Sequence, residues 1–165
     1  MRIANMKSNH GRNRTTTPDM IVIHALGEFI DTEGNDYYAA QYLEYIGLSA
    51  HALISPSGIV IRTRNDDEIA WHAKGFNSNS LGVEVLVPGL HTYHTFSQAI
   101  KLDWVPGKSW DALLELVDFW LEKHKIKPDK IFRHSDLSPD RKIDPGLGFR
   151  WEGFLKDLQF KGEVQ

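Results

Sequence analysis

The chain has 165 residues, of which 41% are hydrophobic and 25% charged, and its formal net charge is -3 at pH 7. This length and balance are typical of one folded domain and exclude a disordered chain. The acidic balance, without any long run of lysine or arginine, argues against nucleic acid or an anionic membrane surface as a partner. The sequence has no cysteine, so disulfides are excluded and any metal must be bound through nitrogen and oxygen.

Residues 1–17 are polar and lack hydrophobic periodicity, so we expect a flexible lead-in before a single domain at 18–160. The apolar, β-branched run 20–23 predicts a buried strand with His24 at its end. Residues 27–35 predict a polar loop, and the apolar spacing across 38–46 predicts a short helix.

Residues 52–54 and 59–61 flank a Pro-Ser-Gly turn, which predicts a hairpin with His51 at its entrance. The run 81–87 predicts an interior strand that carries one carboxylate, Glu84, among apolar neighbours. A charge in such a strand needs a functional or structural reason.

Residues 88–108 predict a long, aromatic-rich connection, after which Ser109 is expected to cap a helix that ends before Pro128. A short strand at 131–132 then delivers His134, and apolar residues at 151, 154, 155 and 158 predict a closing helix. The alternation of strands and helices predicts the fold class α/β, a single domain with a central mixed β-sheet flanked by helices.

The segment 134–146, HSDLSPDRKIDPG, is dense in proline and glycine, so we expect no helix in it. In an extended segment alternate side chains share a face, so Lys142 and Asp144 are expected to point together, and Arg141 and Ile143 to point away from them. We expect a loop in this segment to return the carboxylate of Asp144 to the imidazole of His134.

A catalytic zinc site uses three protein ligands and leaves one position for water, and His24, His134 and Asp144 fit that count. Glu84 is the best placed carboxylate to take a proton from that water, and Lys142 is placed to stabilise an oxyanion. These residue types predict hydrolysis of an amide or ester.

Five sequence motifs indicate which protein family the chain resembles. The chain resembles the zinc-dependent N-acetylmuramoyl-L-alanine amidases of type 2, a family that includes peptidoglycan-recycling amidases, phage lysins and peptidoglycan recognition proteins. The motifs appear in family order and are VIHA at 22–25, SAHALISPSGIV at 49–60, AWHAKGFN at 70–77, SLGVEV at 80–85 and HSDLSPDRKIDPG at 134–146.

The resemblance implies cleavage of the amide between N-acetylmuramic acid and L-alanine of peptidoglycan or muropeptides, with Zn²⁺ as cofactor and 18–160 as the zinc amidase domain. It matches the metal ligands to His24, His134 and Asp144, the general base to Glu84 and the oxyanion-stabilising lysine to Lys142. It also implies that two further histidines line the cleft, as substrate contacts or as hydrogen-bond partners of the ligands: His51 and His72. Trp71 is a candidate substrate contact because an aromatic ring can stack on a sugar face, and its alternative is a place in the core.

Each assignment has an alternative. Taken alone, His24 fits a hydrogen-bonded structural histidine, Glu84 fits an exposed residue of an edge strand and Lys142 fits a surface lysine. The alternative function is a non-catalytic peptidoglycan-binding module of the same fold. The chain shows no secretory signal and no membrane span, so we expect it in the cytoplasm, or released from the cytoplasm as a phage lysin. We also expect a monomer.

Overall fold

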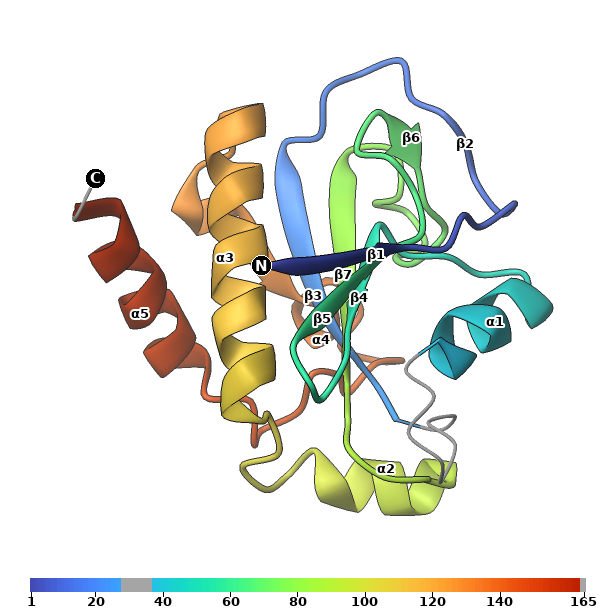
Figure 1. Ribbon diagram of the computed structural model, residues 1–165, viewed down its shortest axis with the longest axis vertical. Coiled ribbons are helices and arrows are strands. Elements are labelled where there is room, and N and C mark those ends of the chain that lie inside the picture. Colours follow the sequence, from blue (N-terminus) through green and yellow to red (C-terminus); the bar gives the residue numbers. More distant parts are fainter. Residues whose placement is uncertain (28–36, 164–165) are drawn as a thin grey trace.

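A computed structural model describes residues 1–27 and 37–163. A six-stranded mixed sheet lies at the centre with helices on both faces (Figure 1), which confirms the predicted α/β fold. The expected loop at 27–35 lies, apart from Gly27, outside the described residues. The sheet comprises β1 (Arg2–Asn5), β3 (Met20–Leu26), β4 (Ala52–Ile54), β5 (Ile59–Arg62), β7 (Ser80–Leu86) and β8 (Ile131–Arg133), while β2 (Arg12–Asn13) and β6 (Glu68–Ile69) form a separate pair.

The strands of the large sheet are ordered β1-β5-β4-β7-β3-β8. The β4–β5 pair is antiparallel, as the predicted hairpin requires, and the other neighbours run parallel. Every residue of β7 is buried, which confirms the predicted interior strand. The register of β3 and β7 places His24 directly opposite Glu84.

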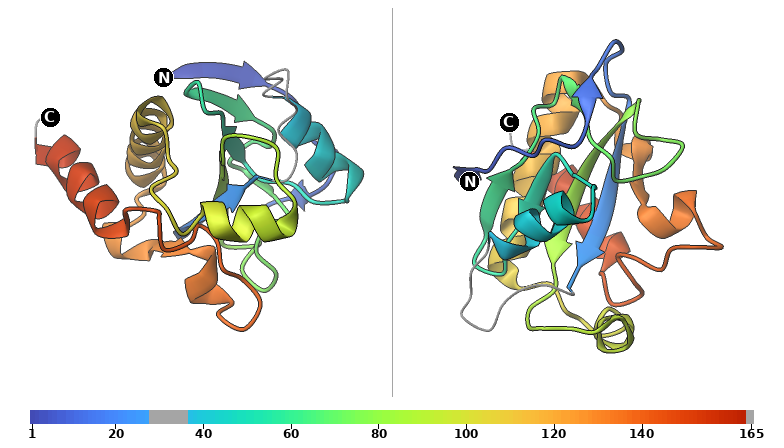
Figure 2. Two further views of the ribbon diagram at one scale, coloured as in Figure 1. Left: turned by 90° about the horizontal axis from the view of Figure 1, so that it is seen from below. Right: turned by 90° about the vertical axis from the view of Figure 1, so that its right-hand side faces the viewer.

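The helices are α1 (Tyr38–Tyr45), α2 (Tyr93–Ala99), α3 (Gly107–His124), α4 (His134–Leu137) and α5 (Trp151–Glu163), with a 3-10 turn at Pro128–Lys130. One face of the sheet is covered by α3, with α5 packed outside it, and the opposite face by α1 (Figures 1 and 2). Alternation along β3 and β7 buries Ile21, Ile23 and Val83 toward α3, so His24 and Glu84 point to the α1 side.

The N-terminal segment differs from the expected flexible lead-in. β1 pairs in parallel with β5 at the edge of the sheet, and β2 pairs with β6. The side chains of β1 are largely exposed, so the strand is held by its backbone hydrogen bonds and leaves little hydrophobic pattern in the sequence.

Three local expectations were wrong. Ser109 lies inside the first turn of α3, where its hydroxyl donates to the carbonyl of Ser55 at 2.8 Å, and the helix begins after Pro106 instead. The connection 88–108 contains α2, capped reciprocally by Thr92 and Thr95. The segment 134–146 opens with the helical turn α4, which ends before Pro139. In the described residues, no helix has the length and apolar character needed to cross a bilayer.

Candidate metal centre and active site

Two neighbouring interior strands supply the first half of the site. His24 lies within β3 rather than at its end, because the strand continues to Leu26. Its partner in β7, Glu84, is 8% exposed, so the edge-strand alternative for this carboxylate is wrong. Parallel pairing therefore fixes an imidazole and a carboxylate side by side on the face of the sheet that α1 covers.

The loop after β8 supplies the second half. His134 begins α4 directly after the strand, and Asp136 braces that turn because its carboxylate accepts a hydrogen bond from the backbone N–H of Arg133 at 3.0 Å. The backbone N–H of Ser135 donates to the carbonyl of Asp144 at 2.9 Å, which closes the loop onto the helical turn. Gly146 has a φ of 87°, and a Cβ there would lie 2.4 Å from the carbonyl oxygen of Ile100, so the chain needs glycine at this point.

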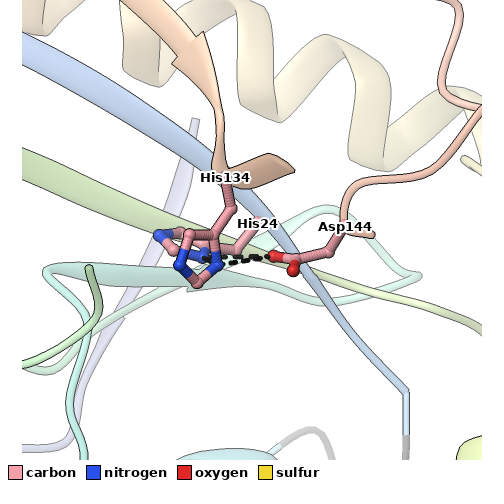
Figure 3. A group of neighbouring side chains, drawn as sticks. All are labelled: His24, His134 and Asp144. Carbon is pink, nitrogen blue, oxygen red and sulfur yellow. Dashed lines mark hydrogen bonds and ion pairs between the residues drawn. The ribbon is translucent and has the colours of Figure 1, made fainter. Parts of the chain in front are cut away.

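Three potential ligand atoms converge where the two halves meet (Figure 3). The Nδ1 atoms of His24 and His134 lie 2.8 Å apart. Oδ2 of Asp144 lies 3.2 Å from the first and 3.1 Å from the second. All three residues are buried. The structure thus brings together the three residues that the sequence predicts as metal ligands.

The protonation of these groups suits cation binding. Burial lowers the pKa of His24 to about 4, against the opposing effect of the Asp144 carboxylate. Burial alone would raise the pKa of Asp144, but its hydrogen-bond contacts with His134 and His24 outweigh burial and hold that pKa below its ordinary value. Near neutral pH the cluster therefore offers a neutral imidazole and an ionised carboxylate, the forms that bind metals.

The separations fit zinc. A tetrahedral zinc site with bonds of about 2.0–2.1 Å has ligand atoms about 3.3 Å apart, close to the separations of this cluster. Facing lone pairs repel one another unless a proton or a cation lies between them. Two nitrogens and one carboxylate oxygen are also a donor set that zinc accepts. The residues present therefore fit a catalytic zinc ion.

A cavity of about 210 Å³ opens onto the cluster, and most of the other predicted site residues line it. Glu84 and Lys142 line it, and Oε1 of Glu84 lies 4.0 Å from Nδ1 of His24. Arg141 and Ile143 line the same cavity, so the expectation that they point away from Lys142 and Asp144 was wrong. The segment turns here, with the N–H groups of residues 141 and 142 both bonded to one carbonyl, and alternation does not apply.

Two of the three additional cleft residues also line this cavity. Trp71 is 40% exposed at its wall. His72 is partly buried, and its Nδ1 lies 2.9 Å from Nε2 of His24. Burial, together with the neighbouring histidines, lowers the pKa of His72 well below its ordinary value, so its imidazole is neutral at pH 7.

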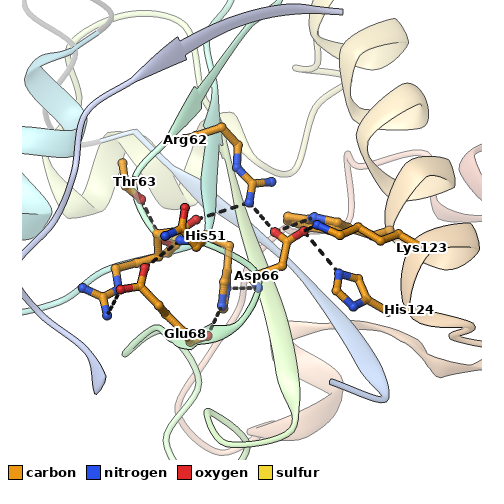
Figure 4. Close-up of polar contacts among 12 residues, drawn as sticks. His51, Arg62, Thr63, Asp66, Glu68, Lys123 and His124 are labelled. Atoms are coloured by element: carbon orange, nitrogen blue, oxygen red, sulfur yellow. Dashed lines mark hydrogen bonds and ion pairs between the residues drawn. The ribbon is translucent and has the colours of Figure 1, made fainter. Parts of the chain in front are cut away.

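His51 does not line the cleft, contrary to expectation. It is fully buried and does not reach the cavity. Its Nδ1 accepts the backbone N–H of Gly82 at 3.0 Å, and its Nε2 donates to the carbonyl of Glu68 at 3.0 Å (Figure 4). His51 therefore joins β4, β7 and β6. The sequence places this histidine in a motif but gives no sign of its burial.

A second polar cluster, also drawn in Figure 4, lies at the sheet side of α3. Asp66 is 5% exposed and pairs with Arg62, with Nζ of Lys123 at 2.8 Å and with Nε2 of His124 at 3.2 Å. Nε1 of Trp120 donates to the same carboxylate at 3.1 Å. This cluster ties the loop before β6 to α3 and has a structural role.

A His-His-Asp cluster that could hold a metal ion, beside a carboxylate and an ammonium group in a cavity, is typical of metal-dependent hydrolases. The sequence of residues 14–147 matches the family model described as N-acetylmuramoyl-L-alanine amidase. The chain belongs to that family, which confirms the expected enzyme class.

Individual known amidases are also similar to the chain in sequence or in fold. The chain is similar to the 1,6-anhydro-N-acetylmuramyl-L-alanine amidase AmpD of Haemophilus influenzae, with 30% identity over 136 residues that cover 79% of this chain and 68% of that protein. For the AmpD of Enterobacter cloacae the identity is 28% over 158 residues, covering 83% and 79%. The solved N-acetylmuramoyl-L-alanine amidase LysC from Clostridium intestinale has the same fold, with a TM-score of 0.72, 20% identity and coverage of 96% and 98%.

Proposed function

We propose that this amidase hydrolyses the amide bond between the lactyl group of N-acetylmuramic acid and L-alanine in soluble 1,6-anhydro-muropeptides, as a monomer with one zinc ion. The observation that carries the proposal is the convergence of His24, His134 and Asp144 at a cavity that Glu84 and Lys142 also line. The curated relatives that cover most of the chain are named for the 1,6-anhydro substrate, which supports that choice over wall polymer.

In this proposal His24, His134 and Asp144 hold the metal. A zinc ion bound in such a site lowers the pKa of water to about 7 and polarises a carbonyl group. The ligands come from β3 and from the braced loop after β8, so the donor atoms are held in place before any metal binds. Little reorganisation is then needed at the metal-binding step.

Glu84 acts as general base. It lies on an interior strand next to a ligand, with its side chain 11% exposed and Oε1 4.0 Å from Nδ1 of His24. From there it can accept a proton from water that attacks the acyl carbon, and return that proton to the amine of L-alanine as the amide bond breaks. The two transfers leave a carboxylic acid and a free amine as products.

Lys142 stabilises the negative charge that develops on the acyl oxygen during the attack. It lines the cavity two residues before Asp144, so the backbone that positions the ligand also positions the ammonium group. Trp71, exposed at the cavity wall, offers an apolar face against which a sugar ring can pack.

The test is mass spectrometry of the products formed from a soluble 1,6-anhydro-muropeptide and, in parallel, from purified sacculi. We expect release of the intact peptide from the soluble substrate, loss of that release with a chelator, and recovery when Zn²⁺ is added back. Faster release from sacculi would overturn the substrate assignment, and chelator-resistant release would overturn the metal assignment.

Asp144→Ala tests the ligand set directly. The variant is expected to lose bound zinc, the stabilisation that zinc gives to the folded state, and product formation together. Asp140→Ala is the matched control, because Asp140 is an exposed carboxylate in the same loop. Zinc content that is the same in both variants would remove Asp144 from the site.

A further inference from the structure

A chain of hydrogen bonds extends from His24 away from the metal-binding cluster. Nδ1 of His24 faces His134 and Asp144, whereas its Nε2 lies 2.9 Å from Nδ1 of His72. On the far side of the second ring, Nε2 of His72 lies 3.1 Å from the hydroxyl of Ser80. That hydroxyl donates to the carbonyl of Phe76 at 2.7 Å.

The donor and acceptor inventory sets the direction of every bond in this chain. A backbone carbonyl only accepts, so the single proton of the Ser80 hydroxyl is used on Phe76. The hydroxyl oxygen must then accept a proton from Nε2 of His72. A neutral imidazole that donates from Nε2 accepts at Nδ1, so Nε2 of His24 carries the proton that completes the chain.

We propose that His72 is a positioning residue that fixes the tautomer of His24, holding its proton on Nε2 so that the Nδ1 lone pair faces His134 and Asp144. The inference rests on the metal site proposed above and deepens it. The second imidazole has no comparable hydrogen bond: among the described residues, Nε2 of His134 is buried without a hydrogen-bond partner. His24 is therefore the ligand whose tautomer is fixed by a hydrogen bond from outside the cluster.

Strand β7, which lies beneath His72, has a glycine at position 82 that leaves space for the imidazole ring. A Cβ added to Gly82 would lie 2.4 Å from Nδ1 of His72 and within 2.6 Å of two ring carbons. An imidazole is rigid, so any side chain at this position must displace the whole ring. The loop that carries the ring is held as well, because the backbone N–H groups of His72 and Ala73 both donate to Oδ1 of Asn77, at 3.1 and 2.7 Å.

The first experiment reads the tautomer in zinc-free protein with ¹⁵N-labelled histidine, using long-range proton–nitrogen correlation spectra. In the wild type we expect His24 to be protonated at Nε2 and bare at Nδ1. His72→Ala should give a mixture of both forms. His72→Asn should restore the wild-type form, because its Oδ1 takes the place of the accepting Nδ1. A wild-type His24 protonated at Nδ1 overturns the proposal without reference to any metal.

The second experiment measures zinc affinity by competition with a chromophoric chelator. We expect His72→Ala to bind about 10–100-fold more weakly, the range in which loss of a ligand's hydrogen-bond partner falls, and His72→Asn to recover most of that loss. Gly82→Ala should lose as much as His72→Ala, because it expels the ring without removing it. Gly82→Ala should cost nothing further in the His72→Ala background. His94→Ala, an exposed histidine on α2, should match the wild type.

The outcomes separate the two proposals. If wild-type protein binds no zinc, the metal site fails, while the zinc-free spectra still decide the tautomer. Wild-type zinc binding that is unchanged in both His72→Ala and Gly82→Ala overturns the positioning role alone. If His72→Ala does not fold, the wild-type spectra and the Gly82→Ala affinity decide instead.

Discussion

Lowering the pH is expected to destabilise the folded chain through His51. The side chain is fully buried between β4, β7 and β6, and this burial lowers its pKa to about 3, although the hydrogen bond to the carbonyl of Glu68 acts the other way. In the unfolded chain the same imidazole has its ordinary pKa of about 6.5. Acid therefore protonates the unfolded chain first.

The sign and size follow from linkage. Between pH of about 6.5 and about 3 the unfolded chain holds one proton on this residue that the folded chain lacks, so stability falls as the pH falls through that window. Each pH unit is worth about 1.4 kcal/mol, so the full window amounts to at most about 5 kcal/mol. That is comparable with the whole free energy of unfolding of many domains.

The assay is urea unfolding at a series of pH values with chelator present, so that metal binding contributes nothing. His51→Asn keeps an acceptor for the N–H of Gly82 but does not titrate, and His94→Asn is the exposed control. Between about pH 4 and pH 6 the wild type should lose about 1.4 kcal/mol per pH unit more than His51→Asn. Equal slopes for these two proteins would refute the reasoning, whatever their stabilities at pH 7.

Three substitutions extend the test to other residues. Glu84→Gln should retain zinc, measured by metal analysis, and lose about two to four orders of magnitude in turnover; undiminished turnover would remove Glu84 from the mechanism. Lys142→Met, which keeps the stem and removes the charge, should lower kcat by about 10²-fold or more with little effect on KM, and an effect confined to KM would indicate a binding role only. Asp66→Asn leaves Arg62 without its buried partner and should destabilise the chain by about 3 kcal/mol in urea unfolding; a loss near zero would mean that solvent takes over its role.

Hydrophobic periodicity predicted most of the regular structure. Burial of one face of an element leaves a period in the sequence. The apolar spacing from Trp110 to Leu121 therefore predicted α3, and the short apolar runs predicted β3, β7 and the hairpin. β1 leaves no such period: it is an edge strand held by backbone pairing. The turn α4 is four residues long and fits before Pro139, so the density of proline in the segment concealed it.

The three converging residues could be named from the sequence because they fall in motifs that resemble those of a known zinc amidase family. Their neighbours could not be ranked in the same way. His51 and His72 belong to similar motifs, yet His51 is sealed in the sheet and His72 reaches the cavity wall. The difference depends on which strand or loop packs beside each ring, and one sequence read alone does not contain that information.

Gly82 contacts both His51 and His72, and it does so in different ways. Its backbone N–H donates to Nδ1 of His51 and its carbonyl accepts the N–H of His51 at 2.9 Å, so the residue binds one ring through its main chain. Its missing side chain leaves the space that the His72 ring occupies. Gly82 and Glu84 are two residues apart on β7 and share the face that holds His24. One strand thus supplies the proposed general base and the space for the residue that orients a proposed ligand, so a side chain introduced at Gly82 is expected to weaken metal binding although Gly82 touches no metal.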